Sequence, residues 1–200
     1  MKIYPTKSKE LNDALGGGLR TGELTVVYNP IDMGGPNWFM LDLAVETASD
    51  RIITDWYDDN KGYDFIPNWI KRHQFADVDF IDRDAIPHWP GQVHIVDHSI
   101  IDKVLRYAKS FLTHNPDVAL VCKCGQYNSR ELLYMADYII SLGSQYDRMV
   151  YVSVIKSRNG KHGTRIQYPL YDYKMDVPPC NSDGHEGEVF NPYTGRWSFF

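Results

Sequence analysis

The residues from 24 to 45 have the order of a phosphate-binding loop but lack the side chains that hold phosphates. The apolar run Leu24 to Tyr28 leads into a turn, and a helical pattern begins near Trp38. In such a loop the backbone N–H groups and the helix dipole surround the phosphates, a lysine contacts the terminal ones and a hydroxyl binds Mg²⁺. We therefore interpret the turn as a degenerate nucleotide loop, formed by Asn29, Asp32, Met33, Gly34, Gly35 and Pro36.

Three positions of this turn oppose phosphate binding. When the loop is aligned on Gly34, the lysine position holds Gly35 and the hydroxyl position holds Pro36. Pro36 also removes one N–H donor, and Asp32 places a negative charge where the phosphates would lie. We therefore expect no catalytic residue at this loop and no bound cofactor.

Composition limits the class of protein. The chain has 200 residues, of which 43% are hydrophobic, enough for one α/β domain with its own core. A net charge of −5 argues against coating nucleic acid through overall charge, although 21 Lys and Arg can form a local basic patch. Three cysteines and the lack of a signal-peptide pattern favour the cytoplasm, and no apolar run reaches the roughly 18 residues of a membrane span. The cysteine spacing matches no standard zinc module, so no metal site is expected.

Strand and helix patterns alternate along residues 1–175. Strands are expected over 23–28, 51–56, 92–96, 118–122, 138–142, 149–155 and 164–169, and helices over 8–15, 37–48, 63–75, 101–113 and 129–136. This alternation predicts an α/β fold with a mainly parallel central sheet, whereas the last two strands flank a basic loop and predict a C-terminal antiparallel hairpin. Residues 76–90 are expected to be irregular, and residues 176–200 to form an irregular tail that docks within the chain or on a partner.

Three separated stretches together resemble one family. Leu11 to Ala44 looks like a lead-in helix, a strand and a phosphate loop, and Val93 to Asp97 is an apolar strand that ends in an acid. Ala136 to Thr164 is similar to a pair of closing strands with a Lys-x-Arg pair near their hairpin. In this order the stretches resemble the RecA-like ATPase core, in the branch of the DnaB-type replicative helicases and the KaiC-like proteins. The resemblance implies a RecA-like three-layer domain over residues 1–175, with Asp97 as the Walker B-like acid.

The resemblance also implies roles for three residues outside the loop. Lys156 and Arg158 match a pair that reaches the ATP of the neighbouring subunit. Gln126 lies near the place of a glutamine that senses nucleotide and contacts nucleic acid. For each of the three, a solvated surface side chain is the alternative.

The basic loop between the last two strands also contains Lys161 and Arg165. In the ring helicases, loops that face the channel bind the phosphates of the strand, so the resemblance offers these residues as nucleic-acid contacts. Tyr168, Tyr171 and Tyr173 follow at near alternation and offer stacking surfaces of the kind used by single-strand binders. A solvated hairpin and packing of the tyrosines on a strand face are the alternatives.

These departures from the family predict a protein without ATPase activity. Besides the lost lysine and hydroxyl, the family's catalytic glutamate is missing after the second strand, where the chain has Asp58. We expect a non-catalytic RecA-like protein of DNA replication or recombination that binds single-stranded nucleic acid, a helicase, a recombinase or another replication protein. Its small size also suits a viral protein in a host cytoplasm, and an oligomer is compatible with the fold. Two alternatives stay open: a divergent active ATPase that uses ATP, Mg²⁺ and a lysine such as Lys123 or a neighbour's Lys156, and a purely structural interaction module.

Overall fold

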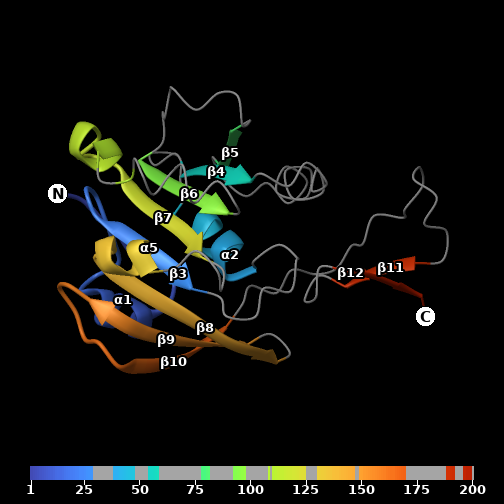
Figure 1. Cartoon of the computed structure of the whole chain (residues 1–200). Helices are drawn as coiled ribbons and strands as arrows, with labels where there is room; N and C mark the ends of the chain where they lie inside the picture. Colours follow the sequence, from blue (N-terminus) through green and yellow to red (C-terminus); the bar gives the residue numbers. More distant parts are fainter. Residues whose placement is uncertain are drawn as a thin grey trace.

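An eight-stranded sheet forms the centre of the molecule (Figure 1). The structure is a computed structural model that describes residues 1–28, 38–47, 54–58, 78–81, 92–97, 108, 110–124, 130–146, 149–169, 188–191 and 196–199. The strands of this sheet are β3 (Leu24–Tyr28), β4 (Thr54–Asp58), β5 (Val78–Ile81), β6 (Val93–Asp97), β7 (Ala119–Cys124), β8 (Tyr138–Tyr146), β9 (Met149–Ser157) and β10 (Thr164–Pro169). Their spatial order is β10-β9-β8-β3-β7-β6-β4-β5.

Six neighbouring strands, from β8 to β5 in this order, are parallel, and β9 and β10 join them antiparallel. The expected mainly parallel sheet and its antiparallel hairpin are therefore confirmed. Because the six strands are parallel, their carboxyl ends meet at one edge of the sheet, where Asp58 pairs with Asp97 in register and Tyr28 with Cys124. We call this edge the carboxyl edge and the opposite one the amino edge.

Helices cover both faces of the sheet and make three layers. On one face lie α1 (Lys9–Leu15) and α2 (Trp38–Thr47), whose Leu11 and Phe39 pack in one core with the β3 side chain Val27. On the other face lie α5 (Arg130–Met135) and the helical residues 110–114, beside a second core that contains Val26. Val26 and Val27 are both fully buried because successive strand residues point to opposite faces and both faces are covered.

Local signals set the ends of α1. The Ser8 side chain accepts a hydrogen bond from the Leu11 N–H and caps the first turn. At the other end Gly16 adopts φ 74°, a left-handed conformation that suits a residue without a Cβ. The helix expected over residues 8–15 is thus confirmed at both ends.

The structure departs from the expected elements in two places. Residues 76–90 were expected to be irregular, but Val78–Ile81 forms β5 because it pairs in parallel with β4. Two short strands, β1 (Ile3–Tyr4) and β2 (Leu19–Arg20), also pair near the N-terminus, although no pattern predicted them. The helix expected over residues 63–75 lies outside the described residues.

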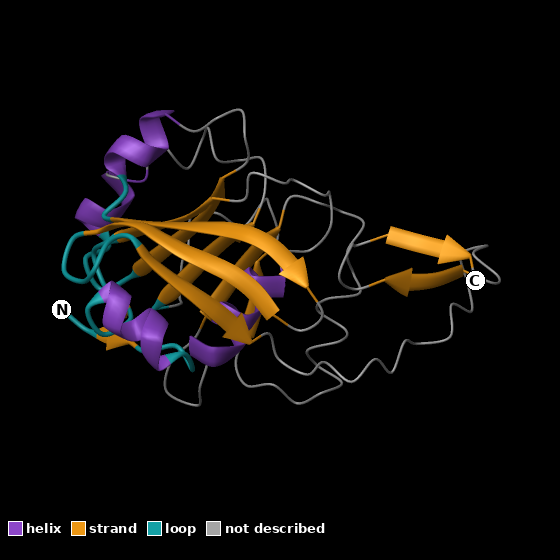
Figure 2. Ribbon diagram, turned by 90° about the horizontal axis from the view of Figure 1, so that it is seen from below, coloured by secondary structure: helices purple, strands orange, loops and turns teal. Residues whose placement is uncertain are grey.

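The described residues of the expected tail form a hairpin instead of irregular chain. β11 (Glu188–Asn191) pairs antiparallel with β12 (Arg196–Phe199). Figures 1 and 2 both draw this hairpin apart from the eight-stranded sheet. None of the described helices has the length and apolar character needed to cross a membrane.

Candidate functional site

The carboxyl edge is where open α/β sheets bind ligands. β3 ends there at Tyr28, immediately before the predicted degenerate loop, and β6 ends there at Asp97, whose Walker B-like role stays a prediction. β7 lies between these two strands. The loop residues 29–36 and Gln126 lie outside the described residues, so their predicted roles stay predictions.

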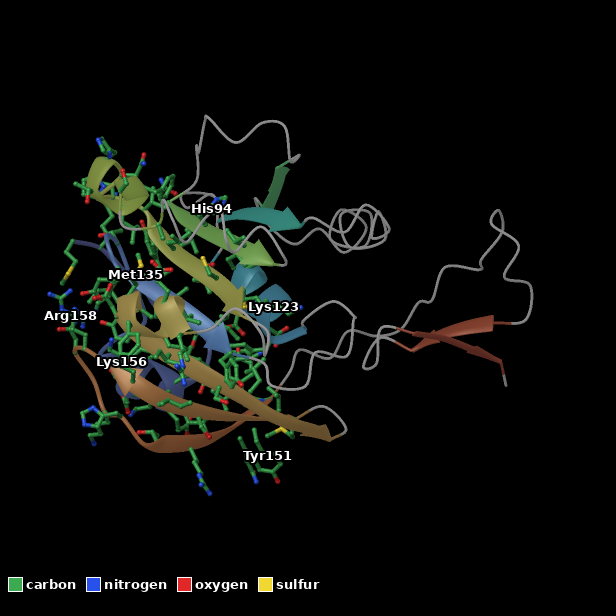
Figure 3. The ribbon with its side chains drawn as sticks, in the orientation of Figure 1. His94, Lys123, Met135, Tyr151, Lys156 and Arg158 are labelled. Atoms are coloured by element: carbon green, nitrogen blue, oxygen red, sulfur yellow. The ribbon has the colours of Figure 1, made fainter. Side chains whose placement is uncertain are left out.

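A buried lysine lies close to the same edge. Lys123 is on β7, next to Val27 of β3 in the parallel register, and only 6% of it is exposed. Figure 3 shows it near the arrowhead of β7, beside α2. A charged ammonium at this depth requires partners for its three donors, since its desolvation is otherwise costly. Lys123 thus places a buried lysine amine near the point where the chain leaves β3 for the predicted loop.

The basic hairpin, which we define as residues 149–169, turns at the amino edge. β9 ends at Ser157 opposite Tyr138, the first residue of β8, and Figure 3 shows Arg158 at the other end of the sheet from Lys123. The hairpin contains four Lys and Arg and no Asp or Glu, although the whole chain has 26 acidic residues and a net charge of −5. This segment is therefore a local positive region in an acidic protein. Its cations are Lys156, Arg158, Lys161 and Arg165.

The turn of the basic hairpin is attached to the end of α1. The Ser157 hydroxyl donates to the Ala14 carbonyl oxygen at 2.8 Å, and the Lys161 N–H donates to the same oxygen at 3.1 Å. Between them, the Gly160 N–H donates to the Ser157 Oγ at 2.9 Å. The contact is so close that a Cβ on Gly160 would collide with the backbone of Ala14. These bonds hold the turn in one position.

A partly buried polar cluster ties the same turn to the sheet. The Tyr138 hydroxyl donates to Glu23 Oε2 at 2.7 Å, and the Asn159 amide donates to Glu23 Oε1 at 3.1 Å and to the Tyr138 oxygen at 2.7 Å. Burial, followed by the hydrogen bond to Glu23, raises the pKa of Tyr138 to about 12. The tyrosine is therefore a neutral donor at physiological pH, and the cluster joins β3, β8 and the hairpin turn.

Lys156 and Arg158 both contact the segment between α5 and β8. The Lys156 ammonium donates to the Ala136 carbonyl oxygen at 2.6 Å. Arg158 Nη1 lies 2.9 Å from Asp137 Oδ1, while Asp137 Oδ2 accepts the Leu24 N–H at 3.0 Å. Arg158 remains 64% exposed, so its ion pair contributes little to stability and its charge stays accessible. Contacts within the chain thus orient both side chains, and they do not test the predicted action on a neighbouring subunit.

Comparison with known proteins establishes the fold. No model of a known protein family and no curated protein matches the sequence. The crystal structure of the RadB recombinase matches with a TM-score of 0.63 and 14% identity, covering 84% of this chain and 96% of that chain. This chain has a RecA-like α/β fold. The flagellar accessory protein FlaH from Methanocaldococcus jannaschii matches it with a TM-score of 0.57 and 12% identity, over 85% of this chain and 96% of the FlaH chain.

The predicted stacking role of one tyrosine, Tyr168, is not supported by its position in the sheet. Tyr168 is fully buried, its hydroxyl donates to Glu46 Oε1 at 2.7 Å, and its ring packs edge-on against Phe39 at 4.8 Å between centroids. Burial, and then the nearby carboxylates, raise the pKa of Tyr168 above its usual value. Stacking of Tyr168 on nucleic acid is therefore wrong, and the packing alternative is confirmed. Tyr171 and Tyr173 lie outside the described residues.

An exposed tyrosine on the neighbouring strand was missed. Tyr151 on β9 is 49% exposed, whereas Val150 and Val152 on either side are buried. The alternation of these three residues was the signal that could have found it, because strand neighbours point to opposite faces. The Tyr151 hydroxyl accepts a hydrogen bond from the Gln167 amide of β10 at 3.3 Å. An aromatic ring therefore lies on the outer face of the basic hairpin.

Proposed function

We propose that this chain is a non-catalytic RecA-like protein of DNA replication or recombination that binds single-stranded nucleic acid through its basic hairpin. A helicase or recombinase is the protein partner it would serve. One observation carries the proposal: the hairpin combines four cations and no acid with a turn held by hydrogen bonds to Ala14 and Tyr138. Such a preorganised cationic surface binds a phosphate backbone without first ordering a loop.

The expected loss of nucleotide chemistry supports the same proposal. The loop sequence has Gly35 and Pro36 where the lysine and hydroxyl of an active site would stand, and Asp32 adds an opposing charge. The proposal includes two further points: the chain is related to the DnaB-type and KaiC-like branch, and its loop is degenerate. The name of one structural neighbour, a recombinase, is compatible with the proposed process.

The salt dependence of binding tests the hairpin. We expect a fluorescein-labelled single-stranded oligonucleotide to bind the wild-type chain, and the double variant Lys161→Gln/Arg165→Gln to bind more weakly. Each phosphate contact on a single strand contributes about 0.7 to the slope of log K against log salt concentration, so the slope should fall by about 1.4. Fluorescence anisotropy over a series of salt concentrations measures both quantities.

Lys9→Gln is the matched control because Lys9 is an exposed lysine that lies on α1, outside the hairpin sequence, and pairs with Asp13. It should leave the salt slope unchanged. Absence of binding by the wild-type chain at physiological salt would overturn the proposal. Equal losses in the control and the double variant would show that overall charge, not the hairpin, attracts the nucleic acid.

A divergent ATPase is the second candidate, and the position of Lys123 favours it. This buried lysine lies beside β3 near the carboxyl edge, where the ammonium missing from the loop would be needed. Under the first proposal, calorimetry with ATP and Mg²⁺ should show no binding heat. Heat in the wild-type chain that is absent in Lys123→Met would favour the second candidate, provided that circular dichroism finds the variant folded. Mg²⁺-dependent turnover abolished by Asp97→Ala would also contradict the first.

A further inference from the structure

One face of the basic hairpin is left open by the helices. On β9 the side chains Val150, Val152 and Val154 are buried toward α1 and α2, so Tyr151 and Ile155 point to the opposite face. That opposite face is covered over the middle of the sheet, by α5 and the helical residues 110–114. On β9 it is open, because Tyr151 is 49% exposed and Ile155 54% exposed.

β10 adds polar and cationic groups to the same open face. In the antiparallel register Gln167 is opposite Tyr151. Arg165 is opposite Ser153, the next residue of β9 on the same face as Tyr151. Arg165 is therefore a diagonal neighbour of the tyrosine, at a separation that long side chains span. The hydrogen bond from Gln167 to the Tyr151 hydroxyl holds the ring on the strand surface. We call this surface the outer face, made by Tyr151, Ile155, Arg165 and Gln167.

We propose that the outer face is a base-stacking surface for single-stranded nucleic acid, with Tyr151 stacking on a base and Arg165 contacting the backbone phosphates. The inference rests on the proposed function and adds the surface on which the bases of the bound strand would lie. A sheet-borne aromatic ring beside cations is the combination by which proteins hold unpaired bases without reading their sequence. A duplex, whose bases are already stacked on one another, offers no base face to this ring.

Charge decides between nucleic acid and a protein as the occupant. An apolar protein partner would need Tyr151 and Ile155, but it would supply no counter-charges to the hairpin's cations, of which Arg158 pairs with Asp137. A phosphate backbone supplies these charges along the whole strand. The six steps along the strand from Tyr151 to Ser157 span about 20 Å, after which the cationic turn begins. This length suits a site of about four nucleotides, the lower end of known single-strand sites.

The test compares three tyrosine variants by anisotropy with a labelled twelve-nucleotide oligothymidylate. Tyr151→Ala should weaken binding by roughly 5- to 100-fold, the range for loss of one stacked base. Tyr151→Phe keeps the ring and should stay within about twofold of wild type on the same grounds. Tyr134→Ala is the matched control because Tyr134 is an exposed tyrosine of α5, and it should also bind like wild type. The salt slope of Tyr151→Ala should equal that of wild type, since the ring neutralises no phosphate.

Each contrary outcome has a distinct meaning. Wild-type affinity in Tyr151→Ala, together with weak binding by Lys161→Gln/Arg165→Gln, would overturn the stacking surface and leave the proposed function standing. Absence of binding by every chain would overturn the proposed function itself. If Tyr151→Ala changed self-association in sedimentation but not binding, a second copy would be the occupant and the inference would be wrong.

Discussion

Gly160→Ala should lower the free energy of unfolding by about 3 kcal/mol, the upper part of the range for inserting an atom into a close-packed site. A Cβ at this position would collide with the carbonyl oxygen of Ala14 and with the backbone of Gly16. Both groups are main chain at the end of α1, so neither moves away at small cost. Urea unfolding followed by circular dichroism measures the loss. Because the turn must shift away from α1, oligonucleotide binding should weaken even where the variant remains folded.

Gly163→Ala is the matched control in the same turn. Gly163 adopts φ 76°, and a Cβ built there would meet no atom within 4 Å. Its alanine variant therefore carries only the strain of the left-handed conformation, about 1–2 kcal/mol. Equal losses for the two variants would contradict the close contact between the hairpin and α1.

Glu23→Ala should cost about 1–3 kcal/mol because it removes the acceptor of the buried Tyr138 hydroxyl. The buried hydroxyl is left without its acceptor, whereas the Asn159 amide belongs to an exposed residue and can bond to water after it loses Glu23. The same change removes the bond from Asn159 to Glu23 and leaves the one to Tyr138, so the hairpin turn should exchange its amide hydrogens faster. Chemical denaturation gives the first quantity, and hydrogen exchange of residues 157–163 gives the second.

Two further variants make this result specific. Glu23→Gln keeps one carbonyl acceptor and should lose less stability than Glu23→Ala. Glu131→Ala removes an exposed carboxylate from the first turn of α5 and should change stability by no more than about 1 kcal/mol. Protection of the turn that is unchanged in Glu23→Ala would show that the bonds to Ala14 alone hold the hairpin.

Elements with local signals were predictable from the sequence, and elements that depend on distant partners were not. α1 was predicted because Ser8 and Gly16 act within a few residues of its ends. β5 was missed because its four residues become a strand only by pairing with β4, more than twenty residues earlier in the chain. The tyrosines show the same limit. Alternation predicts that each tyrosine points to the opposite face from its two strand neighbours, but it does not say which face is covered. Tyr168 is buried because Phe39 of α2 packs on its face, and Tyr151 is exposed on the other.

By itself, the sequence determined the alternation of strands and helices that predicted a mainly parallel sheet, the acid-free charge of the basic hairpin, and the presence of Gly35 and Pro36 in the predicted loop. These properties depend on residue type and on periodicity over a few positions. Only the tertiary structure decided that Lys123 lies near the carboxyl edge, that Tyr151 is on an open face, and that the hairpin turn is attached to α1. The reason is physical: these features depend on register and on contacts between distant residues, such as Glu23 and Tyr138, which are 115 positions apart.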